Sequence, residues 1–142
     1  MAPPAVDLQG VTHRYGEHPA LRDVSLQVSP EALYGLLGPN GSGKTTLFRI
    51  LSTLMPPSEG RAQVFGLDVT RQPDAVRDQI GVVFQDTALD ETLTVRENLR
   101  FQGALYGLHG AALRDRIGTL LHRLDVADRA NDSVDDLSGG LR

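Results

Sequence analysis

The sequence predicts an α/β fold, and three patterns support this prediction. Short apolar strands alternate with turns in the first thirty residues, most regularly over 21–28. A glycine-rich loop at 38–45 follows an apolar segment and precedes a helical pattern. Two further helical patterns, each with an apolar stripe, follow Leu93.

Length, charge and composition limit the classes of protein to be considered. The chain has 142 residues, which allows one domain of ordinary size. Its 14 basic and 18 acidic side chains give a formal charge of −4, so we expect no nucleic acid partner, because binding a phosphate backbone needs clustered cations. The absence of cysteine excludes disulfides and zinc–thiolate sites. No apolar run approaches the roughly 18 residues of a membrane span, and no secretory signal is visible, so a cytoplasmic protein is expected.

Apolar periodicity predicts the individual elements along the chain. Thr94 and Glu97 form the sequence pattern of a capping box, which predicts that a helix starts directly after Thr94. Met55 and the two prolines that follow it predict the end of the preceding helix. The expected strands cover about 6–11, 21–28, 32–37, 60–69 and 80–84, and the other expected helices cover 45–54 and 111–124.

The strongest chemical signal is the sequence GPNGSGKT, which fits the pattern G-x-x-x-x-G-K-[ST]. Glycines let such a loop turn its backbone N–H groups toward a phosphate, and the positive end of the following helix points at the same anion. Lys44 would reach the β- and γ-phosphates, and the Thr45 hydroxyl would bind Mg²⁺. Lys44 is also the only lysine beside thirteen arginines. The predicted nucleotide contacts are Gly38, Pro39, Asn40, Gly41, Ser42, Gly43, Lys44, Thr45 and Thr46.

Three further motifs, in a fixed order around this loop, give the sequence a family resemblance. Tyr15 lies in HRYG before the loop, Gln85 lies in VVFQD after it, and Ser138 lies in LSGG, 94 positions after Lys44. With them the sequence resembles the nucleotide-binding subunits of ATP-binding-cassette (ABC) transporters. The resemblance implies that Tyr15 stacks on adenine and that Gln85 positions Mg²⁺ and the attacking water. It also implies that Ser138, Gly139 and Gly140 contact the ATP held by a partner subunit.

The same resemblance implies how the chain is organised. It implies a phosphate-loop NTPase fold of the ABC ATPase type, with an antiparallel β subdomain at about 1–34. A phosphate-loop core at 35–86 and a helical subdomain at 87–142, ending at LSGG, would follow. In this family the carboxylates that bind Mg²⁺ and polarise water come after the signature motif, so the general base and the C-terminal part of the core sheet are expected to be absent from these 142 residues. The 142-residue chain alone is therefore expected to be poorly stable and to hydrolyse little ATP.

The function implied by the resemblance is an energy-coupling ATPase, with ATP and Mg²⁺ as cofactors. Its expected partners are a second ATP-binding subunit, identical or different, and membrane-spanning permease subunits contacted by residues 86–94. These partners would hold the chain at the inner face of the membrane. The stretch 89–108 resembles two-component drug exporters, although Leu141 replaces the usual glutamine of the signature. Two alternatives stay open: a nucleotide-binding module without hydrolysis, and a non-transport ABC protein acting on ribosomes or DNA.

The remaining polar residues carry no clear site. Asp135 and Asp136 follow no apolar strand, so they are expected to favour a helix start rather than to hold Mg²⁺. The four histidines are far apart in sequence and predict no metal cluster; each is expected at the surface or at its boundary. They are His13, His18, His109 and His122.

Overall fold

The computed structural model describes residues 3–83 and 89–137. The chain divides into two compact units, Met1–Val83 and Phe84–Arg142. Each unit has its own cluster of buried apolar side chains, so each is described by itself.

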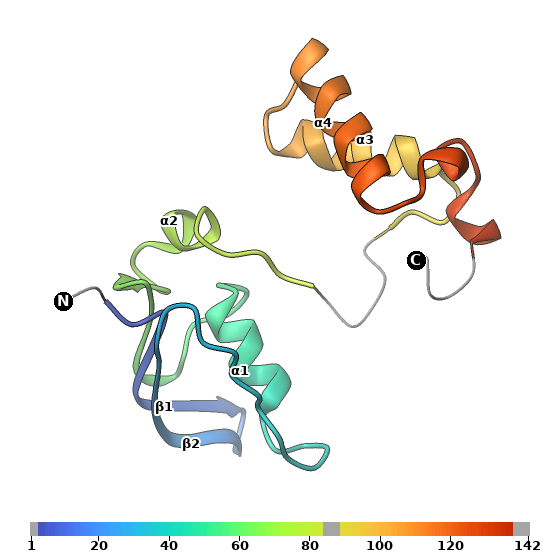
Figure 1. The fold of residues 1–142 in the computed structure, drawn as a ribbon. Coiled ribbons are helices and arrows are strands. Elements are labelled where there is room, and N and C mark those ends of the chain that lie inside the picture. Colours follow the sequence, from blue (N-terminus) through green and yellow to red (C-terminus); the bar gives the residue numbers. More distant parts are fainter. Residues whose placement is uncertain (1–2, 84–88, 138–142) are drawn as a thin grey trace. The chain divides into compact units, whose positions relative to one another are not determined.

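An antiparallel sheet forms the first unit. Strand β1 (Val6–Tyr15) pairs with β2 (His18–Val28) on one edge and with β3 (Glu59–Val64) on the other. Strand β4 (Leu67–Asp68) adds to β3, which gives the order β2-β1-β3-β4. Figure 1 shows β1 and β2 side by side in this sheet. The sheet therefore extends beyond the 1–34 segment expected from the sequence, because the second edge of β1 takes its hydrogen-bonding partner from 59–64.

Helix α1 (Lys44–Leu51) packs against this sheet and closes the first core. The helix ends three residues before the predicted Leu54, because Thr53 adopts a left-handed φ of 62°. A short helix, α2 (Pro73–Arg77), starts on a proline, which suits the first turn of a helix. The buried apolar residues of this unit are Leu8, Val11, Leu21, Leu47, Ile50, Ala62, Val64, Val69 and Val76.

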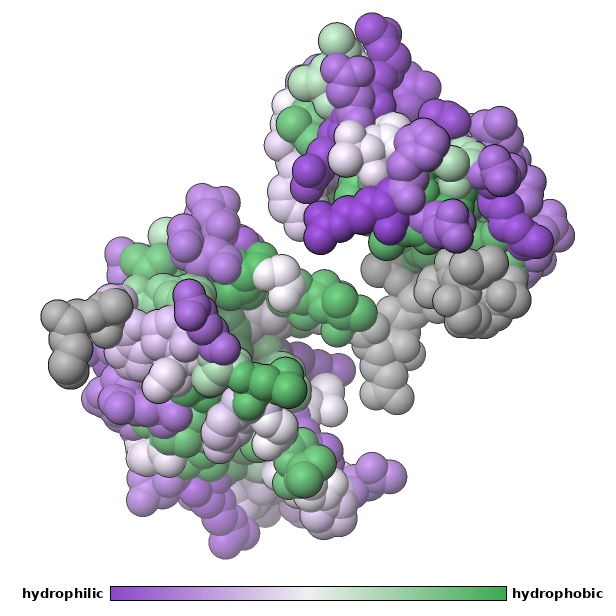
Figure 2. Space-filling model, viewed as in Figure 1, coloured by the Kyte–Doolittle hydropathy of each residue, from purple (hydrophilic) through white to green (hydrophobic). Residues whose placement is uncertain are grey.

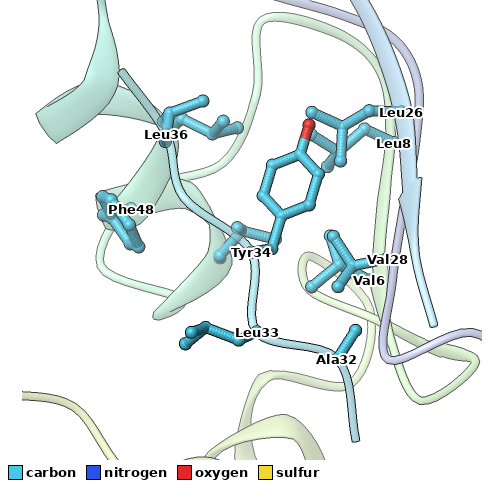
Figure 3. Close-up of a pocket in the computed structure, with 11 residues that line it drawn as sticks. Val6, Leu8, Leu26, Val28, Ala32, Leu33, Tyr34, Leu36 and Phe48 are labelled. Atoms are coloured by element: carbon cyan, nitrogen blue, oxygen red, sulfur yellow. The ribbon is translucent and has the colours of Figure 1, made fainter. Parts of the chain in front are cut away.

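Two predicted strands are wrong. Neither 32–37 nor the described part of 80–84 belongs to the sheet. An apolar run becomes a strand only when its backbone N–H and C=O groups pair with a neighbouring strand. The segment 32–36 instead lies over the face of the sheet through its side chains, as Figure 3 shows.

An apolar pocket of about 330 Å³ lies between that segment, the sheet and α1 (Figure 3). The Tyr34 ring points into it, toward Leu8 and Leu26. Leu33 and Leu37 are fully or almost fully exposed, at 104% and 95%. Figure 2 shows further hydrophobic residues on the visible surface of this unit. Apolar surface of this kind is typical of a unit that packs against more protein.

The second unit is helical. Helix α3 (Val95–Leu105) packs on α4 (Gly110–Arg123), and two 3₁₀ turns, η1 (Ala127–Arg129) and η2 (Val134–Asp136), follow. The helix predicted over 111–124 is thus confirmed with its bounds shifted by one residue. The predicted capping box is also confirmed, since the Glu97 N–H donates to the Thr94 hydroxyl (3.2 Å) and the Thr94 N–H donates to the Glu97 carboxylate (2.9 Å). Over 3–83 and 89–137, no helix is long and apolar enough to cross a bilayer.

Candidate functional site

The glycine-rich loop takes a path that ordinary side chains would oppose. Gly41 and Gly43 have φ values of 80° and 87°, in the left-handed region. Gly43 is also the N-cap of α1, and a Cβ atom there would collide with the carbonyl oxygen of Ala20 on β2. The loop is therefore seated directly against β2, and glycine is required at the position where the helix begins.

Lys44 places the single lysine charge of the chain on this loop. Its Nζ donates hydrogen bonds to the carbonyl oxygens of Gly38 and Pro39, both at 2.7 Å, and to Ser42 Oγ at 3.2 Å. The first N–H groups of α1 have no intrahelical carbonyl to bond, so they carry the positive end of the helix dipole beside the same loop. Backbone N–H groups and an ammonium group together form a donor set suited to a polyphosphate.

Tyr15 is tied to the same helix. Its hydroxyl lies 3.5 Å from Thr46 Oγ1 and donates to Met55 Sδ at 3.5 Å. The hydrogen bond with Thr46 lowers the pKa of the Tyr15 phenol, the nearby Arg49 guanidinium lowers it further, and partial burial opposes both. The Tyr15 side chain is held by the contacts of its hydroxyl group, and the residue is still 45% exposed. Its ring is therefore accessible to a stacking partner.

Three neighbours of Tyr15 were not predicted as part of this site. Arg49 and Met55 come from α1 and the turn after it, and His13 lies two residues before Tyr15 on β1. The His13 ring meets the Tyr15 ring edge-on, with centroids 4.9 Å apart. Met55 lies 40 residues beyond Tyr15, and no local sequence pattern indicates contacts of that separation.

The expected position of His13, at the surface or at its boundary, is wrong. Its side chain is 8% exposed, and its Nδ1 atom has no hydrogen-bond partner among residues 3–83 and 89–137. Irregular pairing between β1 and β2 on both sides of His13 breaks the strict alternation of the strand. Three consecutive residues, 11–13, are therefore buried.

The structure brings together only part of the predicted site. Tyr15 and the loop residues Gly38 to Thr46 lie within the first unit and are joined through Thr46. Gln85 and the three signature residues, Ser138, Gly139 and Gly140, lie outside the described residues. The predictions made for those four residues stay predictions.

The loop residues fit the groups that the sequence predicts. A nucleotide phosphate needs N–H donors and a cation, and the loop supplies both beside α1. Thr45 is exposed at the start of α1, so its hydroxyl is accessible as one oxygen ligand of Mg²⁺. Within 3–83 and 89–137, no group of three His, Asp or Glu side chains could hold a metal ion without help from a nucleotide.

A second polar cluster in the first unit has a structural role. The buried Asp68 carboxylate accepts hydrogen bonds from the Thr70 N–H (3.0 Å), the Arg71 N–H (3.1 Å) and Arg61 Nε (3.1 Å). Burial raises the pKa of Asp68, but these donors and the Arg61 charge outweigh it, so the pKa lies below its usual value. Asp68 therefore stabilises the turn between β4 and α2.

Comparison with known proteins agrees with this geometry. The profile of the ABC transporter family matches residues 21–142. The chain is 46% identical over all its 142 residues to the daunorubicin resistance ATP-binding protein DrrA3 of Streptomyces coeruleorubidus, and covers 45% of that protein. It is 41% identical over 124 residues to the ABC transporter ATP-binding protein NatA of Bacillus subtilis, covering 50% of it. The chain thus spans about half the length, or less, of these relatives.

Solved structures give the same answer for the fold. An ATP-binding subunit of an ABC transporter superposes with a TM-score of 0.79 at 27% identity, over 96% of this chain and 57% of the other. The ATP-binding cassette MJ1267 superposes with a TM-score of 0.80 at 24% identity, over 96% and 60% of the two chains, which supports the fold alone. From the profile match, the identities and the phosphate loop beside Tyr15, the chain belongs to the ABC transporter family.

Proposed function

We propose that this chain is the nucleotide-binding part of an ATP-binding subunit that powers a drug exporter. The observation that carries the proposal is the joined arrangement of Lys44, the left-handed glycines and Tyr15 around the start of α1. Relatives named for daunorubicin resistance support export as the process. In this proposal the transport path would belong to separate membrane-spanning permease subunits, which would hold the protein at the inner face of the membrane.

In this proposal each described residue has a separate task. Tyr15 would stack on the adenine ring, for which aromatic stacking contributes about 1–3 kcal/mol per base. Lys44 and the N–H groups of the loop would bind the β- and γ-phosphates, and Thr45 would bind Mg²⁺. Bound Mg²⁺ supplies charge neutralisation during phosphoryl transfer. Gln85 would orient the attacking water, and Ser138, Gly139 and Gly140 would contact ATP on a second copy or a related subunit.

The 142-residue chain is expected to bind ATP without hydrolysing it efficiently. None of its residues is assigned as the general base that activates water, so we expect it to bind ATP but to turn over little of it. The test is equilibrium binding of a fluorescent ATP analogue with and without Mg²⁺, together with phosphate release. We expect binding that is lost in Lys44→Ala and retained in Arg77→Ala, a surface control outside the loop.

Two results would contradict the proposal in different places. If Lys44→Ala still binds the analogue, the phosphate loop is not part of the nucleotide site. Rapid Mg²⁺-dependent phosphate release that disappears in Lys44→Ala would keep the site but show that a general base is present within these 142 residues.

A further inference from the structure

The contacts of the Tyr15 hydroxyl leave one movement of its side chain unopposed. The hydroxyl oxygen lies 3.5 Å from both Thr46 Oγ1 and Met55 Sδ. A tyrosine ring rotates about the axis through Cγ and Cζ, and the hydroxyl oxygen lies on that axis. Rotation of the ring therefore leaves both of these distances unchanged. The hydroxyl contacts fix the position of the end of the side chain, but they do not fix the plane of the ring.

The plane of the Tyr15 ring decides whether a base can stack on it. Stacking brings the flat face of a base against the face of an aromatic ring. Tyr15 is exposed, and the torsion that rotates a tyrosine ring has a broad energy profile. A ring that is held only at its hydroxyl therefore samples many tilts, and a neighbour that opposes the rotation would prepare it for a base.

The His13 ring is placed to oppose this rotation. His13 lies two residues before Tyr15 on β1, and the centroids of the two rings are 4.9 Å apart. Their planes meet at 74°, which is the favourable edge-to-face arrangement of two aromatic rings. Rotation of the Tyr15 ring would lose this arrangement. A nearly perpendicular neighbour also covers at most one face of Tyr15, so the other face stays open to a base.

His13 is held more firmly than the ring it contacts. It is buried, and on β2 it pairs with Leu21, whose side chain lies close to Gly43 at the start of α1. Its Nδ1 atom has no hydrogen-bond partner within residues 3–83 and 89–137. A buried polar atom without a partner destabilises a fold. The role of His13 therefore lies in its ring contact and not in a hydrogen bond of Nδ1.

We propose that His13 is a positioning residue that sets the plane of the Tyr15 ring for stacking on the base of the bound nucleotide. This inference rests on the proposed function, because it takes Tyr15 as the residue that stacks on adenine. His13 would act through Tyr15 and would not contact the nucleotide. It should therefore affect the part of the binding affinity that comes from the base, and not the part that comes from the phosphates.

The test compares two ligands that both carry a triphosphate but differ in the presence of a base. ATP and inorganic tripolyphosphate would each displace a fluorescent ATP analogue from the full chain in the presence of Mg²⁺. The variants are His13→Leu, which removes the ring, and His13→Phe, which keeps a planar ring. The control variant is His122→Leu, which makes the same change at an exposed position of α4. Urea denaturation would measure the stability of each variant.

We expect His13→Leu to bind ATP about three- to tenfold more weakly than wild type, because the edge-to-face contact is lost. Its affinity for tripolyphosphate should stay within about twofold of wild type. His13→Phe should keep most of the affinity for ATP, and His122→Leu should bind both ligands as wild type does. His13→Leu should also keep its stability, since the substitution removes the unpartnered Nδ1. A purely structural role predicts that stability and both affinities fall together.

Four results would overturn the proposal. Equal losses of ATP and tripolyphosphate affinity in His13→Leu would mean that His13 supports the phosphate loop. Equally weak ATP binding by His13→Leu and His13→Phe would exclude the ring contact. Wild-type ATP affinity in His13→Leu, together with weaker binding by Tyr15→Ala, would leave the stacking role of Tyr15 intact and exclude His13 alone. Wild-type ATP affinity in Tyr15→Ala would contradict the base site of the proposed function, and this inference with it.

Discussion

Two alanine substitutions in the phosphate loop separate backbone strain from steric collision. Gly41 and Gly43 have nearly equal φ values, 80° and 87°, so alanine at either position meets the same left-handed penalty of roughly 1–2 kcal/mol. Their surroundings differ. Among the described residues, a Cβ at Gly41 would meet nothing within 4 Å, whereas one at Gly43 would collide with the Ala20 carbonyl and would lie 2.7 Å from Leu21 Cδ2.

The difference between the two variants can be worked from these contacts. Gly41→Ala should lower the free energy of unfolding by roughly 1–2 kcal/mol. Gly43→Ala adds a steric term of about 1–3 kcal/mol, because either β2 or the start of α1 must move. The expected loss for Gly43→Ala is therefore about 2–5 kcal/mol. Its ATP affinity should fall further than that of Gly41→Ala, since Gly43 sets the direction of the first N–H groups of α1.

Urea denaturation followed by circular dichroism measures the first quantity, and titration with a fluorescent ATP analogue measures the second. Wild type and both variants would be compared in the same buffer. Equal losses of stability in Gly41→Ala and Gly43→Ala would refute the reasoning, because the contact with β2 would then contribute nothing.

Three further predictions concern Thr94, Asp68 and Tyr15. Thr94→Ala should lower the free energy of unfolding by about 1 kcal/mol, and Thr94→Ser should not, because serine keeps the capping hydroxyl; equal urea midpoints for the two variants would contradict this. Because the pKa of Asp68 is lowered in the folded state, its carboxylate stabilises the fold at pH values above the unfolded pKa of about 3.9. This stabilisation is lost as the pH falls through the folded pKa. In urea titrations, wild type should therefore lose stability relative to Asp68→Asn below about pH 4. A difference in free energy of unfolding that does not change with pH would contradict the lowered pKa of Asp68. Tyr15→Ala should weaken binding of a fluorescent ATP analogue by about 1–3 kcal/mol while Tyr15→Phe keeps most of the affinity; similar affinities for both would exclude stacking.

Features with a local cause were predictable from the sequence. The Thr94–Glu97 capping box depends on residues three apart, and the helix starts where that pattern places it. The phosphate loop likewise ends at Gly43, and α1 begins at Lys44, because glycine and helix-forming residues meet there. These elements need no information about distant parts of the chain.

Features that depend on distant pairing were not predictable. The segment 32–37 has the composition of a buried strand, yet it finds no strand partner in the described residues and stays irregular. His13 is buried because the pairing of β1 with β2 is irregular around it, which depends on register rather than on residue type. The contact between Tyr15 and Thr46 spans 31 positions and becomes visible only in the folded unit.

The hydrogen bonds of Lys44 have a consequence for how the loop accepts its ligand. The Lys44 ammonium group bonds to two carbonyl oxygens of the loop, which would otherwise repel an incoming phosphate. When a phosphate binds, Lys44 therefore exchanges hydrogen bonds to these carbonyl oxygens for hydrogen bonds to the phosphate. A measured ATP affinity is accordingly a difference between two sets of bonds to one nitrogen atom. Substituting Lys44 changes the free loop as well as the loaded one.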